Sequence, residues 1–229
     1  MSAAFQELVI EHGLPAWQKQ RHFLAWLNEH EWFWDQNSGV LSLRRLDKSV
    51  EVRCTTQALG SVSQMSETWT WIWANELAEL DETLMVAARR LKQIGEERGI
   101  PELTIGEFPH AQVNADLLAL VAMELLNGEA YYRGTYLGGA GYLLIESGLS
   151  DLLPPIPDEA EDVIPIAHQA AWIVPDFQRQ AIVSYLKSSG WQCEENAEIL
   201  VARRGNQQVY LVFNNENELL SAEVVSRKI

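Results

Sequence analysis

Short runs of alternating hydrophobic and polar residues between positions 31 and 74 predict an antiparallel meander. The runs occupy residues 31–35, 40–43, 50–63 and 66–74, and small turn residues separate them. Successive side chains of a strand point to opposite faces. We therefore expect the three indoles of the last run to share one face, and those of residues 31–35 to extend that surface from a neighbouring strand.

A period of 3.6 residues replaces this alternation elsewhere and predicts helices. Such stripes follow Pro15 as far as residue 27, and recur over residues 80–98 and 114–127. The stripe at 114–127 is apolar nearly all round, which favours a central, buried helix. Strand-like runs at 130–137 and 141–146 flank a glycine-rich turn and predict a hairpin.

The chain changes character after residue 150. Residues 152–165 hold four of the eight prolines and four acidic residues, a composition typical of an extended linker. We predict a large domain over residues 1–150, an acidic Pro-rich linker over 151–165 and a small domain over 166–229. The small domain combines a helix beginning near Pro175 with four strand-like runs. The fold class is therefore α+β: an antiparallel meander sheet packed with helices, followed by a small helix-plus-antiparallel-sheet domain.

Composition narrows the function classes. The chain has 229 residues, 17 Lys and Arg against 32 Asp and Glu, and a net charge of −15. Because phosphate contacts need clustered basic residues, we expect no nucleic-acid partner. No apolar run reaches the roughly 18 residues of a membrane helix, so we expect no membrane partner. The N-terminal residues lack a basic, then apolar, secretion signal, and the expected location is cytoplasmic.

Metal and cofactor chemistry has little support in the pattern. Cys54 and Cys193 lie far apart, which favours free thiols in a reducing compartment. The five histidines include no pair three or four residues apart, and no CxxC occurs. We expect neither a metal nor a cofactor.

The tryptophans are the most distinctive residues, since nine occur in this chain. Three indoles on one strand are explained either as sealed core or as an aromatic groove for a peptide, sugar or small ligand. An asparagine after them suits a turn, and an arginine among tyrosines suits either a carboxylate or phosphate contact or a solvated edge. The candidate binding residues are Trp69, Trp71, Trp73, Asn75, Trp32, Trp34, Tyr132 and Arg133.

Part of the chain resembles a known family. The residues that carry the likeness are Gly60-Ser61, the Trp-x-Trp-x-Trp-Ala-Asn stretch at 69–75, an Ala-rich helix ending near Gly99, and Ala130-Tyr131-Tyr132-Arg133. Over residues 30–146 they resemble a family of bacterial domains of unknown function. The resemblance implies an α+β fold and brings no activity, cofactor or catalytic residue.

No catalytic signature stands out. Glycines at 138–141 precede a strand-like run, whereas a phosphate loop must lead into a helix, so a hairpin turn is favoured. The leading hypothesis is a non-enzymatic binding or interaction module whose partner is an unknown protein or small molecule, for example immunity-like neutralisation of a basic partner. The alternatives are a small hydrolase-like enzyme with a carboxylate-containing pocket, and a structural module that forms homo-oligomers.

Overall fold

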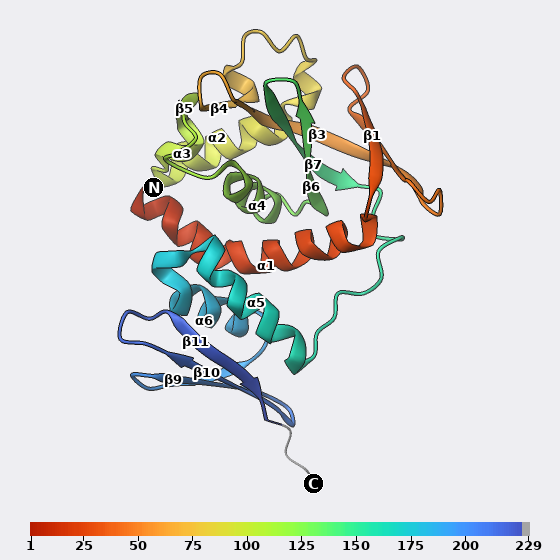
Figure 1. Cartoon of the computed structure of the whole chain (residues 1–229). Helices are drawn as coiled ribbons and strands as arrows, with labels where there is room; N and C mark the ends of the chain where they lie inside the picture. Colours follow the sequence, from red (N-terminus) through yellow and green to blue (C-terminus); the bar gives the residue numbers. More distant parts are fainter. Residues whose placement is uncertain (226–229) are drawn as a thin grey trace. The chain divides into compact units, whose positions relative to one another are not determined.

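The computed structural model describes residues 1–225, which form two compact units (Figure 1). The first comprises residues 1–6 and 19–154, and the second comprises residues 7–18 together with the chain from residue 155 onward. Helix α1 (Ala3–Leu27) therefore contributes its middle to the second unit and its two ends to the first. Among the described residues, no helix is long and apolar enough to cross a membrane.

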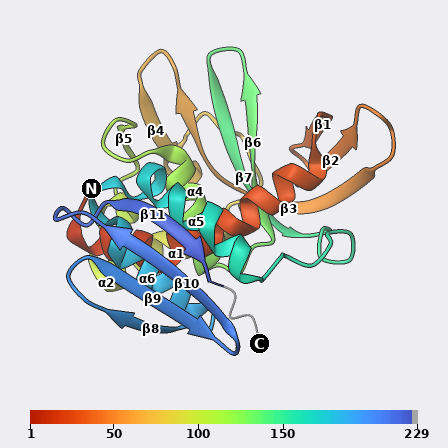
Figure 2. The same ribbon diagram turned by 60° about the horizontal axis from the view of Figure 1, so that its bottom comes forward.

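The first unit is built on a seven-stranded antiparallel sheet. In order along the sheet, β1, β2, β3, β4 and β5 are neighbours, while β7 pairs with β3 and β6 pairs with β7. The strands are β1 (His30–Asp35), β2 (Val40–Arg45), β3 (Glu51–Ser63), β4 (Thr68–Trp71), β5 (Glu107–Pro109), β6 (Ala130–Tyr136) and β7 (Gly139–Ser147). Figure 2 shows the β3–β4 and β6–β7 hairpins as two separate arms. The predicted antiparallel α+β fold is confirmed.

A bulge in β3 decides which side chains share a face. Its register with β7 pairs Ala58 with Leu143 and Gly60 with Tyr142, which leaves Leu59 without a partner on β7. Because side chains alternate with period two, one extra residue moves every later side chain to the opposite face. Even-numbered residues of β3 therefore lie on one face before Leu59 and on the other face after it.

Helices cover one face of this sheet. α2 (Val86–Arg98) packs against β3 and the short α3 (Pro101–Thr104), and α4 (Ala115–Leu125) packs against β6 and β7. Asn114 caps α4 by accepting a hydrogen bond from the Asp116 backbone N–H at 2.8 Å, and Gly99 ends α2 with φ of 67°. The buried helix expected at 114–127 is confirmed, since most of α4 is buried. We call this side of the sheet the helix face.

Helix α1 begins earlier than the pattern indicates. Ser2 caps it by accepting a hydrogen bond from the Phe5 N–H, so Pro15 lies inside the helix and not in its first turn. The expectation about Pro15 was wrong because proline is a stronger signal in sequence than a serine cap. In a helix it removes one backbone hydrogen bond without necessarily ending the helix.

The second unit contains two helices and a four-stranded antiparallel sheet. α5 (Ala160–Ile173) packs against β10 and β11, and α6 (Gln178–Ser188) packs against β8 (Figure 2). The strand order is β11, β10, β9, β8. The strands are β8 (Gln192–Glu195), β9 (Ile199–Arg204), β10 (Gln207–Phe213) and β11 (Leu219–Val224). The four predicted strands are present, whereas α5 was not predicted.

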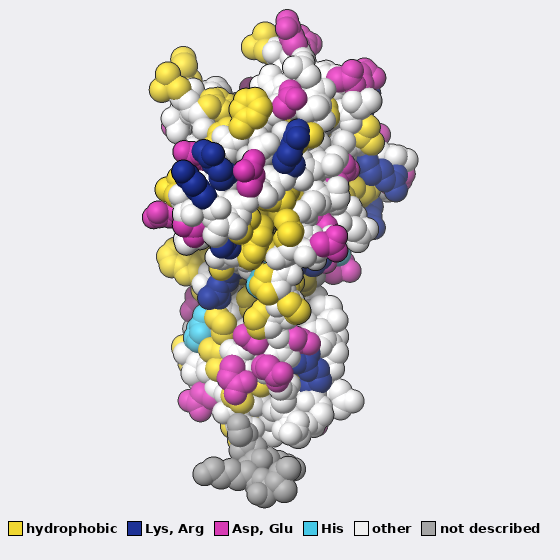
Figure 3. Space-filling view, turned by 90° about the vertical axis from the view of Figure 1, so that its right-hand side faces the viewer, with side chains coloured by type: hydrophobic (Ala, Val, Ile, Leu, Met, Phe, Trp, Pro, Cys, Tyr) yellow, Lys and Arg dark blue, Asp and Glu magenta, His cyan; other side chains and the backbone are white. Residues whose placement is uncertain are grey.

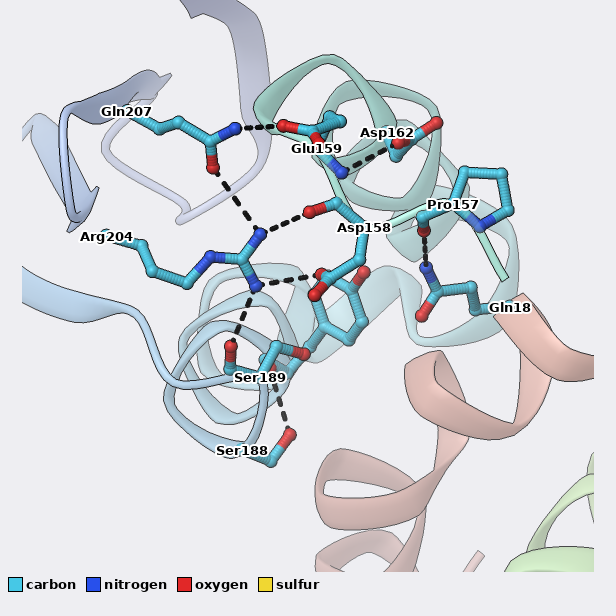
Figure 4. Close-up of polar contacts among 10 residues, drawn as sticks. Gln18, Pro157, Asp158, Glu159, Asp162, Ser188, Ser189, Arg204 and Gln207 are labelled. Atoms are coloured by element: carbon cyan, nitrogen blue, oxygen red, sulfur yellow. Dashed lines mark hydrogen bonds and ion pairs between the residues drawn. The ribbon is translucent and has the colours of Figure 1, made fainter. Parts of the chain in front are cut away.

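The acidic Pro-rich segment ends as a helix, although we expected it to be extended as far as residue 165. Glu159 and Asp162 form a capping box in which the Glu159 N–H donates to Asp162 Oδ2 at 2.9 Å. Acidic groups in a first turn are stabilised by the helix dipole, so their repulsion does not keep the chain extended. Arg204 holds the same end, because it donates to Asp158 Oδ1 at 2.8 Å and to the Ser189 carbonyl at 3.1 Å (Figure 4).

Candidate ligand pocket

Two of the candidate tryptophans form core on the helix face. Trp69 pairs with Val62, Trp71 pairs with Gly60, and both indoles are fully buried. Their rings meet edge to face with centroids 5.1 Å apart. Trp71 Nε1 donates to the Glu102 carbonyl at 2.9 Å. These two indoles therefore have no surface to offer a ligand.

Trp73 does not continue that ladder. The strand predicted over residues 66–74 ends at Trp71, and Trp73 lies in the 3-10 turn η1 (Ile72–Ala74). Its indole lies near Gly106, and Lys92 Nζ stands 4.4 Å from its ring centroid. The prediction that Trp73 shares a strand face with the other two was wrong, because a turn of 3-10 helix breaks the period of two.

A pocket of about 770 Å³ opens on the face opposite the helix face. Its walls come from β1, η1 and the segment 75–80, and its floor comes from β3, β6 and β7. The lining residues are Trp32, Phe33, Trp34, Gln36, Ala58, Gly60, Ser61, Ile72, Asn75, Leu77, Ala78, Glu79, Leu80, Gly134, Tyr136, Gly141, Tyr142 and Leu143. This volume lies within the range of about 300–1,000 Å³ typical of small-molecule sites.

The bulge at Leu59 explains why two groups of indoles lie on different faces. Trp32 and Trp34 pair with Leu43 and Leu41, and through β2 they share the face of β3 before the bulge. Trp69 and Trp71 pair with β3 after it. The expectation that Trp32 and Trp34 extend the surface of the later tryptophans was therefore wrong.

The two pocket indoles are held from behind. Trp34 Nε1 donates to Thr56 Oγ1 at 3.0 Å, and that hydroxyl donates to the Gly39 carbonyl at 2.7 Å. Trp32 rests on Gly134, where an added Cβ would stand 2.7 Å from Trp32 Cη2. The hydrogen bond of Trp34 and the contact of Trp32 with β6 form this wall in the absence of a ligand, so binding would cost little side-chain entropy.

Small residues make the floor. Ser61 of β3 pairs with Gly141 of β7, which pairs with Gly134 of β6, while Ala58 of β3 pairs with the larger Leu143. A Cβ at Gly141 would meet only Tyr136 Cε1, at 4.0 Å, so the space above this glycine is open. A largely apolar floor with aromatic walls suits an apolar group.

The segment 75–80 forms the remaining wall. Asn75 Oδ1 accepts a hydrogen bond from the Leu77 N–H at 3.2 Å, the turn role considered for this residue. The turn directs Leu77 outward, and 92% of it is exposed. Figure 3, which views the side of Figure 1 where β1 lies, shows exposed hydrophobic side chains among acidic and basic ones.

The last two candidates lie outside the pocket lining. Tyr132 is buried beneath Trp32, with ring centroids 5.6 Å apart, and its hydroxyl lies 2.9 Å from His30 Nε2. Burial raises the pKa of Tyr132 well above its ordinary value, so it is a neutral hydroxyl. Arg133 points to the helix face, where its guanidinium lies 3.9 Å from the Asp116 carboxylate and half of it is exposed. Only Trp32, Trp34 and Asn75 of the eight candidates line the pocket.

The lining offers little for acid–base catalysis. It contains one carboxyl group, Glu79, and its other ionisable groups are the phenols of Tyr136 and Tyr142. Burial raises the pKa of Tyr142 far above its ordinary value, so its phenol stays protonated. Within residues 1–225, no three His, Cys, Asp or Glu side chains are grouped closely enough to hold a metal ion.

Sequence reasoning missed most of the floor. Ala58, Ser61 and Gly141 have small side chains that form no distinctive chemical motif. They contribute to the pocket because they leave its volume unfilled. One signal was present in the sequence: an isolated glycine within a strand pattern, such as Gly60, marks a bulge or a close approach.

One of the comparisons with known proteins gave a match. A family model described as a family of unknown function (DUF6882) matches residues 6–148. This span contains residues 30–146, over which the sequence resembles a family of domains of unknown function, and it also includes most of α1. Neither the curated proteins nor the solved structures gave a match.

Proposed function

Because the chain belongs to DUF6882, a family of unknown function that assigns it no ligand, we propose a function from the pocket: the protein binds a small aromatic or apolar molecule there. The carrying observation is a preformed space of about 770 Å³ between two indoles, one of them hydrogen-bonded to Thr56, and a floor that includes Ala58, Gly134 and Gly141. Pockets with these properties are the usual small-molecule sites of proteins.

Binding without catalysis fits this lining best. General acid–base catalysis needs groups that can exchange protons near neutral pH. Glu79 is the one carboxyl group in the lining, and no second carboxyl or imidazole lines the pocket with it. The absence of Lys and Arg from the lining also supports a ligand other than nucleic acid. The two free cysteines of the described chain support a reducing location, which we propose to be the cytoplasm.

The test uses a neutral probe and a variant that fills the floor. We expect 2-naphthylmethanol to bind the wild-type protein in isothermal titration calorimetry. Gly141→Phe should abolish that binding, because its ring would occupy the open space above the floor while a strand accepts phenylalanine readily. Thr135→Val is the matched control, since Thr135 is exposed and its pairing with Ala140 places it on the helix face.

Near-UV circular dichroism verifies that both variants fold. If the wild type fails to bind the probe, or if a folded Gly141→Phe protein binds it as well as the wild type, the proposed function is wrong.

A further inference from the structure

The charge of the pocket deepens the proposed function, on which the following inference rests. Of the eighteen lining residues, Glu79 is the one with an acidic side chain. The other polar side chains of the lining are uncharged and each has an oxygen atom that can accept a hydrogen bond: Gln36, Ser61, Asn75, Tyr136 and Tyr142. Within residues 1–225, no Lys, Arg or His lines the pocket. An anionic ligand would therefore lose its hydration without gaining a cationic partner.

Glu79 itself has no ion-pair partner within residues 1–225. Its neighbours along the chain do not supply one, because residues 75–84 contain four acids and no basic residue. Two of these acids are engaged: Glu82 pairs with Arg89 at 3.0 Å, and Asp81 accepts from the Thr83 hydroxyl at 2.6 Å. Glu79 is itself exposed, so the wall of the pocket carries a solvated carboxylate without an ion-pair partner among residues 1–225, which favours a positive charge nearby.

The pocket indoles also differ from others in the same unit. Trp26 and Trp73 each carry a cation from the chain itself, Arg45 at 5.2 Å and Lys92 at 4.4 Å. In the part of the chain that the structure describes, no such cation stands over Trp32 or Trp34. Indole rings attract cations through their negative faces. Trp32 lines the pocket and is 39% exposed, so a ligand can reach it.

The net charge of the first unit also favours a cationic ligand. Residues 1–6 and 19–154 hold 11 Lys and Arg against 19 Asp and Glu, a net charge of −8. Such a field attracts cations and repels anions before contact.

We propose that the natural ligand is a small organic cation, an ammonium group joined to an aromatic or aliphatic body. The ammonium lies between the Glu79 carboxylate and the indoles of Trp32 and Trp34. The apolar body covers the floor formed by Ala58, Gly134 and Gly141.

Three naphthalene probes that share one ring and differ in charge test this inference. They are 2-naphthylmethyl-trimethylammonium, 2-naphthylmethanol and 2-naphthylacetate, titrated calorimetrically into the full chain at low ionic strength. We expect the cation to bind about 10-fold more tightly than the neutral alcohol, and the anion to bind most weakly. Glu79→Gln should weaken binding of the cation about 3–5-fold and change binding of the alcohol by less than about 2-fold.

Glu76→Gln is the matched control. Glu76 lies in the same segment and loses the same charge, but it does not line the pocket, so its effect on the cation should be smaller than that of Glu79→Gln. The inference is overturned if the three probes bind equally, if the anion binds most tightly, or if Glu79→Gln and Glu76→Gln have equal effects. The proposed function survives each of these results as long as 2-naphthylmethanol binds, whereas failure of all three probes overturns both.

Discussion

Replacement of Gly60 by alanine tests whether the bulge of β3 holds the two faces of the sheet as described. A Cβ at Gly60 would stand 2.6 Å from the Thr70 carbonyl oxygen and 2.6 Å from Trp69 Cζ2. Ordinary contact begins near 3.4 Å, so both neighbours would have to retreat by about 0.8 Å. Neither can do so easily, because Trp69 is fully buried and Thr70 is paired on both sides in the sheet.

The magnitude follows from two opposing effects. Overpacking of a core costs about 1–3 kcal/mol, with the upper part applying where backbone must move. Alanine also restricts the unfolded chain, which returns about 0.4–1 kcal/mol. The net loss in the free energy of unfolding should be about 2 kcal/mol. In urea this corresponds to a midpoint lowered by about 1 M, for an m-value of about 2 kcal/mol/M.

Urea unfolding followed by near-UV circular dichroism measures this loss, and Gly134→Ala is the matched control. Its Cβ would stand 2.7 Å from Trp32 Cη2, an equally short contact, yet Trp32 is 39% exposed and can swing outward. We expect this variant to lose less than about 1 kcal/mol. An unchanged midpoint for Gly60→Ala, or a larger loss for Gly134→Ala than for Gly60→Ala, would refute the reasoning.

Three further predictions concern other parts of the chain. The buried amide of Gln20 donates to the Tyr131 carbonyl and accepts from the Tyr131 N–H, both at 3.0 Å. Gln20→Ala would leave these two backbone groups unpaired, so the free energy of unfolding measured in urea or by heating should fall by about 2–4 kcal/mol. Arg204→Ala removes the contacts at the start of α5 and the stacking 4.5 Å above a tryptophan ring, and it should speed hydrogen exchange over residues 158–165 more than Arg204→Lys does. Burial raises the pKa of the Cys54 thiol to about 12, so a thiol reagent at pH 8 should modify Cys193 first and Cys54 only in urea. Since the folded pKa is the higher one, this thiol favours the folded state at neutral pH and loses that contribution as the pH rises from about 8.5 towards 12.

Local patterns predicted the elements of the fold well where one physical rule governed each element. Strands alternate because one face is buried, and the runs at residues 31–35 and 50–63 became β1 and β3. The helix after Asn114 had both a cap and an apolar face. α5 was missed because its prolines were given more weight than the Glu159-x-x-Asp162 capping pattern, which was also visible in the sequence.

The pocket was largely beyond prediction because it depends on relations between distant segments. A single unpaired residue, Leu59, separates two sets of indoles that look equivalent in sequence. The floor depends on glycines whose contribution is the space they leave, and a residue pattern does not show which neighbour uses that space. Trp32 and Trp34 could be proposed as binding residues from their type, whereas Glu79 became visible only when its segment was placed beside them.

The course of α1 has a consequence for how this protein can change by exchange of segments. Residues 7–18 belong to the same compact unit as the chain from residue 155 onward, although more than 130 residues separate them. Gly13 illustrates the dependence, since an added Cβ there would touch Ile173 Cγ2 at 3.4 Å. In a recombinant that receives a new C-terminal segment alone, that segment would have to pack against an α1 whose side chains fit the original one. A recombination event that exchanges the second unit must therefore exchange both coding segments, the one for residues 7–18 and the one from residue 155 onward.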